Sequence, residues 1–141
     1  MLKLLIAVDG SPASLRAIDT AARLGRDTPV EAVLLHVRDA PSYHGDIPPY
    51  DYERIAAAQR RHQDGVLESA LAHATAAGLG AVQTQAEMGT AAADIARVAS
   101  DRRVDMIVIG TRGATVLGGL LVGSVAQRVV HLASVPVLLV K

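Results

Sequence analysis

The chain has 141 residues, enough for one domain with its own hydrophobic core. Its 14 Lys and Arg residues balance its 14 Asp and Glu residues, and this argues against a nucleic-acid-binding protein, which carries a basic excess. The absence of cysteine excludes a disulfide framework and a zinc–thiolate site. No apolar run approaches the ~20 residues of a membrane span or has the pattern of a signal peptide, so we expect a cytoplasmic protein with no membrane partner.

The first half of the chain alternates apolar runs with helical patterns. Ser11 in the N-cap position, with Pro12 after it, predicts a helix start. The proline- and tyrosine-containing range Arg38–Tyr52 predicts a surface loop. In the helix after this loop, Gln63 is expected on the water-exposed side. The expected elements are strand Leu2–Val8, helix Pro12–Leu24, strand Val30–Val37 and helix Tyr52–Ala77.

The second half continues the alternation. Val82–Met88 alternates apolar and polar residues, which predicts a half-exposed strand at a sheet edge. Met106–Ile109 has no polar residue, as expected of a central parallel strand that is buried on both faces. Ser124 is expected to be the N-cap of the helix that follows. The expected elements are strand Val82–Met88, helix Ala91–Ser100, strand Met106–Ile109, helix Val125–Leu132 and strand Val135–Val140.

This order of elements predicts a single α/β domain over residues 1–141. Strands that alternate with helices form a parallel sheet with helices on both faces, which is a doubly wound, three-layer α/β/α sandwich. Because Phe and Trp are absent, the core must be built from Ala, Val, Leu and Ile.

A glycine-rich stretch joins the fourth expected strand to the last helix. Glycines let backbone N–H groups approach an anion closely, and a helix N-terminus adds partial positive charge, so the stretch predicts a phosphate site. The Walker A lysine, the G-x-G-x-x-G fingerprint and the G-x-S-x-G nucleophile elbow are all absent. The alternative is an ordinary connection that binds nothing. The glycines are Gly110, Gly113, Gly118, Gly119 and Gly123.

The spacing Gly110-x2-Gly113-x9-Gly123-Ser124 resembles the nucleotide-binding signature of the universal stress protein family, in its ATP-binding branch. The resemblance implies a Rossmann-like adenine nucleotide-binding fold with strand order 3-2-1-4-5. It covers nearly the whole chain, since three further segments resemble the family's first, second and fifth strands: Leu4–Ser11, Leu34–Val37 and Val135–Lys141.

In that strand order the chain adds strands first to one side of the first strand and then to the other, starting with the fourth strand. Ligands bind in the crevice between these two strands. The resemblance implies that backbone N–H groups of Gly113, Ser124 and Val125 hold phosphates. Arg112 either supplies positive charge to them or is a solvated surface residue. The remaining residues expected along this loop are Gly110, Thr111 and Gly123.

The base of the nucleotide is expected at the ends of the first two strands. Ala7 and Val37 match family positions whose backbone lies against adenine, and Asp9 matches a residue at the base and ribose end. The alternative for Asp9 is a turn aspartate that accepts hydrogen bonds from the amides of Ser11–Ser14.

The implied ligand is ATP with Mg²⁺, which would enter with the phosphates and need few protein ligands. No metal-ligating or catalytic side chain is identified, and His36 and His131 are expected to be structural. The resemblance implies a homodimer through the edge strand Val135–Val140, since an apolar edge invites pairing.

The leading hypothesis is an ATP-binding universal stress protein that acts as a nucleotide-responsive regulatory module. The alternative is a slow ATPase or autophosphorylating enzyme on the same site. A phosphoacceptor receiver domain is disfavoured because Asp9 stands alone where that class needs an acidic cluster, and a dimer that has lost nucleotide binding is disfavoured by the intact glycine spacing.

Overall fold

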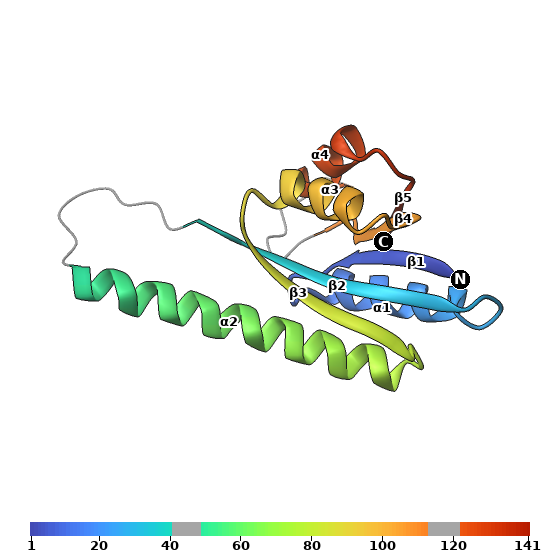
Figure 1. Cartoon of the computed structure of the whole chain (residues 1–141), viewed down its shortest axis with the longest axis horizontal. Helices are drawn as coiled ribbons and strands as arrows, with labels where there is room; N and C mark the ends of the chain where they lie inside the picture. Colours follow the sequence, from blue (N-terminus) through green and yellow to red (C-terminus); the bar gives the residue numbers. More distant parts are fainter. Residues whose placement is uncertain (41–48, 113–121) are drawn as a thin grey trace.

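The computed structural model describes residues 1–40, 49–112 and 122–141, and there strands and helices alternate along the chain (Figure 1). The strands form one parallel sheet in the order β3-β2-β1-β4-β5, which confirms the predicted α/β fold and strand order. The elements are β1 (Leu2–Ala7), α1 (Pro12–Leu24), β2 (Val30–Asp39), α2 (Pro49–Ala76), β3 (Ala81–Gly89), α3 (Ala91–Asp101), β4 (Met106–Gly110), α4 (Ser124–Leu132) and β5 (Val137–Val140).

Two apolar clusters lie on opposite faces of the sheet. Leu4 and Ile6 of β1 belong to the cluster that includes α1 and α2, whereas Leu5 and Ala7 belong to the cluster that includes α3 and α4. Successive side chains of a strand point to opposite faces, so one strand contributes to both clusters. The buried hydrophobic side chains of the described residues are all Ala, Val, Leu or Ile, as the composition predicted. None of the helices described there is both long and apolar enough to cross a membrane.

Three predicted boundaries were displaced by two or three residues, and the others by one at most. Strand β2 continues to Asp39 and α2 begins at Pro49, so the connection is shorter than the predicted Arg38–Tyr52 loop. Proline suits the first turn of a helix because its missing N–H would have no partner there. Strand β5 begins at Val137 instead of Val135, and the carbonyl of Pro136 accepts a hydrogen bond from Ile107 N–H at 2.9 Å.

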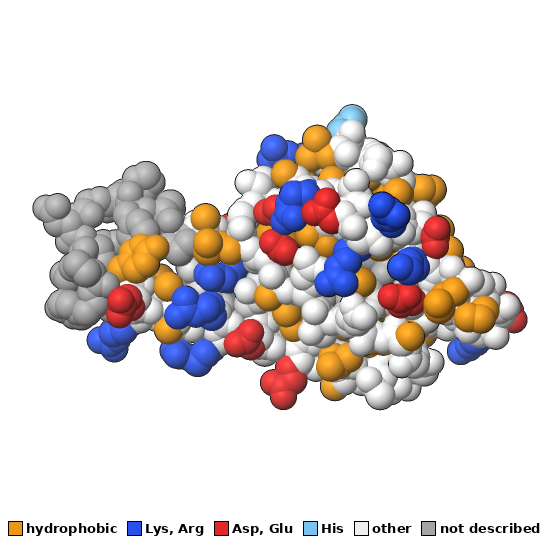
Figure 2. Space-filling model, viewed as in Figure 1, with side chains coloured by type: hydrophobic (Ala, Val, Ile, Leu, Met, Phe, Trp, Pro, Cys, Tyr) orange, Lys and Arg blue, Asp and Glu red, His pale blue; other side chains and the backbone are white. Residues whose placement is uncertain are grey.

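The β3 edge of the sheet is polar, and its position at the edge was predicted correctly. On the side of β3 next to α3, Arg97 contacts Glu87 at 3.0 Å and Asp94 and Asp101 at 3.1 Å each. Figure 2 shows Lys and Arg side chains next to Asp and Glu side chains over this part of the molecule. Exposed pairs of this kind stabilise a fold by about 0–1 kcal/mol each, so they contribute little to stability. Charged side chains at a sheet edge oppose pairing with another strand.

Candidate functional site

A cavity of about 450 Å³ opens at the carboxyl ends of β1 and β4. These strands are neighbours in the sheet, and the connections that leave them lead to helices on opposite faces. A crevice at this place is the usual ligand site of doubly wound sheets. Nine of the ten predicted site residues line the cavity: Ala7, Asp9, Val37, Gly110, Thr111, Arg112, Gly123, Ser124 and Val125. The tenth, Gly113, lies outside the described residues.

The end of β4 touches the first turn of α1. A Cβ atom added at Gly110 would lie 2.8 Å from Ala13 Cβ and 2.9 Å from the Ala13 carbonyl carbon. Glycine is therefore required here by helix-on-strand packing, a reason separate from the loop role that the resemblance implied. This close packing fixes the position of the first turn of α1 relative to the end of β4, both of which border the cavity.

The turn between β1 and α1 is held by its own side chains. The Ser11 hydroxyl accepts from Ser14 N–H at 3.2 Å, which makes Ser11 the predicted N-cap. Asp9 Oδ1 accepts from Ser11 N–H at 2.9 Å. Asp9 therefore has the turn role foreseen as its alternative, and it also lines the cavity. Ser11 and Ser14 are buried lining residues that the sequence reading did not assign to the site.

The start of α4 differs from α1 in its capping. We expected Ser124 to be the N-cap, but the helix begins at Ser124 and Gly123 occupies the N-cap position. Glycine has no side chain to accept a hydrogen bond, and α4 has no side-chain cap within the described part of the chain. The first-turn N–H groups of α4 therefore lie beside the cavity without the hydroxyl acceptor that α1 has. An uncapped helix N-terminus attracts an anion through these N–H groups and the helix dipole.

The position of α4 is fixed by backbone contacts around Thr111. Thr111 N–H donates to Val140 O of β5 at 2.8 Å, and Thr111 O accepts from Gly123 N–H. Gln127 Nε2 donates to Val122 O at 3.0 Å. These bonds hold the N-terminus of α4 next to the ends of β4 and β5, at one side of the cavity.

The opposite side of the cavity is apolar. Val37 and Leu35 of β2 and Ala7 of β1 line it together with Ala91 and Ile95 of α3. The α3 residues were missed because their spacing marks them as core, and this pattern does not distinguish a core face from the wall of a cavity.

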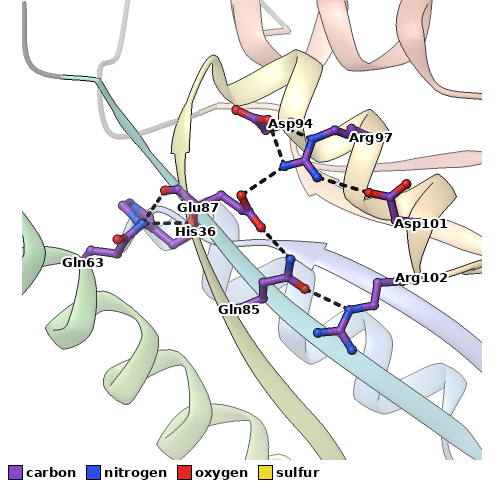
Figure 3. A network of polar contacts seen from close by, with 8 residues as sticks. All are labelled: His36, Gln63, Gln85, Glu87, Asp94, Arg97, Asp101 and Arg102. Carbon is purple, nitrogen blue, oxygen red and sulfur yellow. Dashed lines mark hydrogen bonds and ion pairs between the residues drawn. The ribbon is translucent and has the colours of Figure 1, made fainter.

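A buried glutamine next to this apolar end corrects one prediction. Gln63 of α2, expected on the water-exposed side, is 4% exposed. Its Nε2 donates to His36 O at 3.0 Å and to Glu87 O at 2.8 Å, so one side chain joins α2 to the adjacent strands β2 and β3 (Figure 3). Its spacing of four and seven residues from Leu67 and Ala70 would have placed Gln63 on the buried face.

The charge of the cavity comes from few side chains. Asp9 and Arg112 are the acidic and basic residues, besides His36, among its described lining residues, and Arg112 is exposed. Burial lowers the pKa of His36 from its ordinary value, His62 lowers it further, and Asp9 opposes the change. Across the described ranges, no group of three or more His, Cys, Asp or Glu side chains could hold a metal ion. The cavity therefore combines an apolar lining with the N–H groups at the start of α4.

Comparison with known proteins gives the same family as the glycine spacing. The model of the universal stress protein family matches residues 1–141. The universal stress protein YxiE of Bacillus subtilis is 33% identical, over 99% of this chain and 98% of its own length.

Solved structures show the same fold. The universal stress protein UspA of Lactobacillus plantarum has a TM-score of 0.86 and 21% identity over 99% of this chain and 97% of its own. A family protein from Arabidopsis thaliana with AMP bound has a TM-score of 0.73 and 20% identity, over 100% of this chain and 92% of its own. Since the family model and a relative above 30% identity both span the chain, this protein belongs to the universal stress protein family.

Proposed function

We propose that this chain binds ATP with Mg²⁺ in the cavity between β1 and β4 and acts as a nucleotide-responsive regulatory module of the stress response in the cytoplasm. The observation that carries this proposal is the uncapped N-terminus of α4, which borders a cavity with an apolar opposite side. A nucleotide has this same division, with an apolar ring at one end and phosphates at the other.

The lining residues suggest one orientation for the nucleotide. The phosphates lie at the backbone N–H groups of Ser124 and Val125, where the α4 dipole favours negative charge. Adenine lies against Ala7 and Val37, and Asp9 lies between the two ends. The AMP bound to the Arabidopsis protein supports an adenine nucleotide. Mg²⁺ is expected to be held mainly by phosphates and water, because it keeps several waters and needs few carboxylates.

The experiment is a calorimetric titration of ligand-free protein with MgATP, and with AMP for comparison. In Ser124→Asp, a carboxylate at the first position of α4 favours the helix through its dipole but repels a phosphate. Loss of MgATP binding by a variant that melts no lower than wild type supports the proposal.

The matched control is Ser100→Asp, which adds the same charge in the last turn of α3, away from the cavity. Binding should survive in this variant. If wild type binds neither MgATP nor AMP, or if Ser124→Asp binds as wild type does, the proposed site is wrong.

We propose binding in preference to turnover. Asp9 is the one carboxylate among the described lining residues, and its Oδ1 is already hydrogen-bonded to Ser11 N–H. Attack on a phosphate by water requires a group that orients the water. Phosphate release from MgATP should therefore not exceed the rate measured with Ser124→Asp, and a faster release by wild type would favour the slow ATPase.

We also propose a homodimer through β5 and the residues Val135–Pro136 before it. Leu139 of β5 and the neighbouring Val130 and Leu132 of α4 are 36%, 48% and 52% exposed. Such an apolar edge favours pairing with a second copy, in contrast to the polar β3 edge. Light scattering should give twice the chain mass for wild type and a lower mass for Leu139→Lys. Met88→Lys, on the other edge strand, is the control, and an unchanged mass for Leu139→Lys would contradict the proposal.

A further inference from the structure

A buried histidine stands between the cavity and helix α2. His36 is 8% exposed and is one of the residues that line the cavity. Its Nδ1 atom is buried and makes no hydrogen bond. Its ring meets the ring of His62 of α2 edge-on, with a centroid distance of 6.5 Å and an angle of 78° between the planes. A buried ring nitrogen without a partner is unusual and invites a functional explanation.

The groups that act on this ring come from both sides. Asp9, at the end of β1, favours the protonated ring, whereas His62 of α2 and burial favour the neutral ring. Gln63 holds the carbonyl of His36 in place from α2 (Figure 3). The backbone of His36 is therefore held by α2, and the protonation of its ring depends on a balance that additional negative charge can tip.

We propose that His36 takes up a proton when an anionic nucleotide enters the cavity, so that nucleotide affinity rises as the pH falls through the range in which His36 titrates. The inference rests on the proposed function. The proton comes from solvent and adds to the imidazole, whose two ring nitrogens then both carry hydrogen.

The size of the effect follows from the sheet. The strand of His36, β2, and the strand that ends at the proposed phosphate site, β4, are separated by β1 alone. Neighbouring strands lie about 4.8 Å apart, and two such spacings separate β2 from β4. The proposed phosphate position is therefore about 10 Å from the ring of His36. At an effective dielectric constant of about 20, one negative charge at that distance raises a pKa by about one pH unit. Binding should then be about tenfold tighter below this range than above it.

One effect opposes this change. A bound nucleotide excludes water from the cavity, and loss of water favours the neutral ring. His36 is already buried in the ligand-free structure, at 8% exposure, so little hydration is left to lose. The charge of the phosphates therefore dominates, and the net result is proton uptake.

The test is calorimetric titration with MgATP at pH 6 and pH 8, each in buffers of different ionisation enthalpy, which yields the number of protons taken up. Wild type should take up protons at pH 6 but not at pH 8. His36→Gln should bind at both pH values with no proton uptake from this position. Subtracting the proton uptake of this variant from that of wild type removes any contribution of the nucleotide's own phosphates.

His62→Gln is the control variant, because its side chain is exposed and its loss leaves the cavity lining intact. Proton uptake should persist in this variant and shift to higher pH, since one group that favours the neutral ring is removed. Uptake that survives in His36→Gln, or disappears in His62→Gln alone, overturns the inference. Binding at both pH values without uptake overturns it while leaving the proposed function intact, whereas no binding at either pH overturns both.

Discussion

The contact between β4 and α1 makes a sharp prediction for Gly110→Ala. The added Cβ would lie 2.8 Å from Ala13 Cβ, 2.9 Å from the Ala13 carbonyl carbon and 3.0 Å from its oxygen. Nonpolar carbon atoms pack best at about 3.5–4.0 Å. The first turn of α1 must therefore move away from β4, and no side-chain rotation can relieve the collision because two of the three atoms belong to the backbone.

The cost can be estimated from overpacking in other cores. An extra methyl group forced into a packed site destabilises a fold by about 1–3 kcal/mol. For a chain of this size, each kcal/mol lowers the melting temperature by roughly 3–5 °C. Gly110→Ala should therefore melt roughly 3–15 °C below wild type and unfold at a lower denaturant concentration, with a similar slope.

The matched control is Gly65→Ala, the same chemical change in the interior of α2. Apart from the adjacent residues and the nearby backbone of α2 itself, a Cβ atom there has no heavy atom within 4 Å, and alanine is the better helix former. This variant should be stabilised by about 0.5–1 kcal/mol. Urea denaturation of both variants decides the matter. If Gly110→Ala is as stable as wild type, the close approach of α1 to β4 is wrong.

Three further predictions concern hydrogen bonds and protonation. Gln63→Leu leaves the carbonyls of His36 and Glu87 without their donor and should cost about 1–3 kcal/mol in urea denaturation; equal stability would contradict the buried amide. Ser11→Ala removes the α1 cap and should cost about 1 kcal/mol, whereas Ser11→Asp should retain most of the stability. Because the folded state lowers the pKa of His36 below its ordinary 6.5, the unfolded chain binds a proton first, and the free energy of unfolding should fall as pH drops below about 6.5. A pH series of denaturation curves should show this fall in wild type and a smaller one in His36→Gln.

Sequence pattern predicted the fold because each strand and helix has a strong periodic signal. The all-apolar Met106–Ile109 became the buried β4, and the alternating Val82–Met88 became the edge strand β3. Boundaries were less certain where local signals compete. Gly123 and Ser124 are both acceptable N-cap residues. In the structure Gly123 takes this position, with its N–H bonded to Thr111 O at the end of β4.

Only part of the candidate site could be predicted, because local signals identify some of its residues and long-range packing places the others. The glycine spacing and the ends of the strands identified residues that the topology brings to one cavity. Helical spacing was enough to place Gln63 on the buried face of α2, but its bonds to two strands depend on how α2 packs against the sheet. The place of Ile95 in the cavity wall likewise depends on how α3 packs there. A buried polar side chain that bonds to strand carbonyls has no local sequence signature, although helical spacing indicates its face.

The most direct test of the proposed site follows backbone amides by NMR during titration of ¹⁵N-labelled protein with MgATP. We expect the largest shifts at the amides of Ser124 and Val125, further shifts at Val37 and near Asp9, and small shifts along the β3 edge. Shifts confined to other surfaces, or no shifts at saturating MgATP, would contradict the claim that the α4 N-terminus and the ends of β1 and β2 form a nucleotide site.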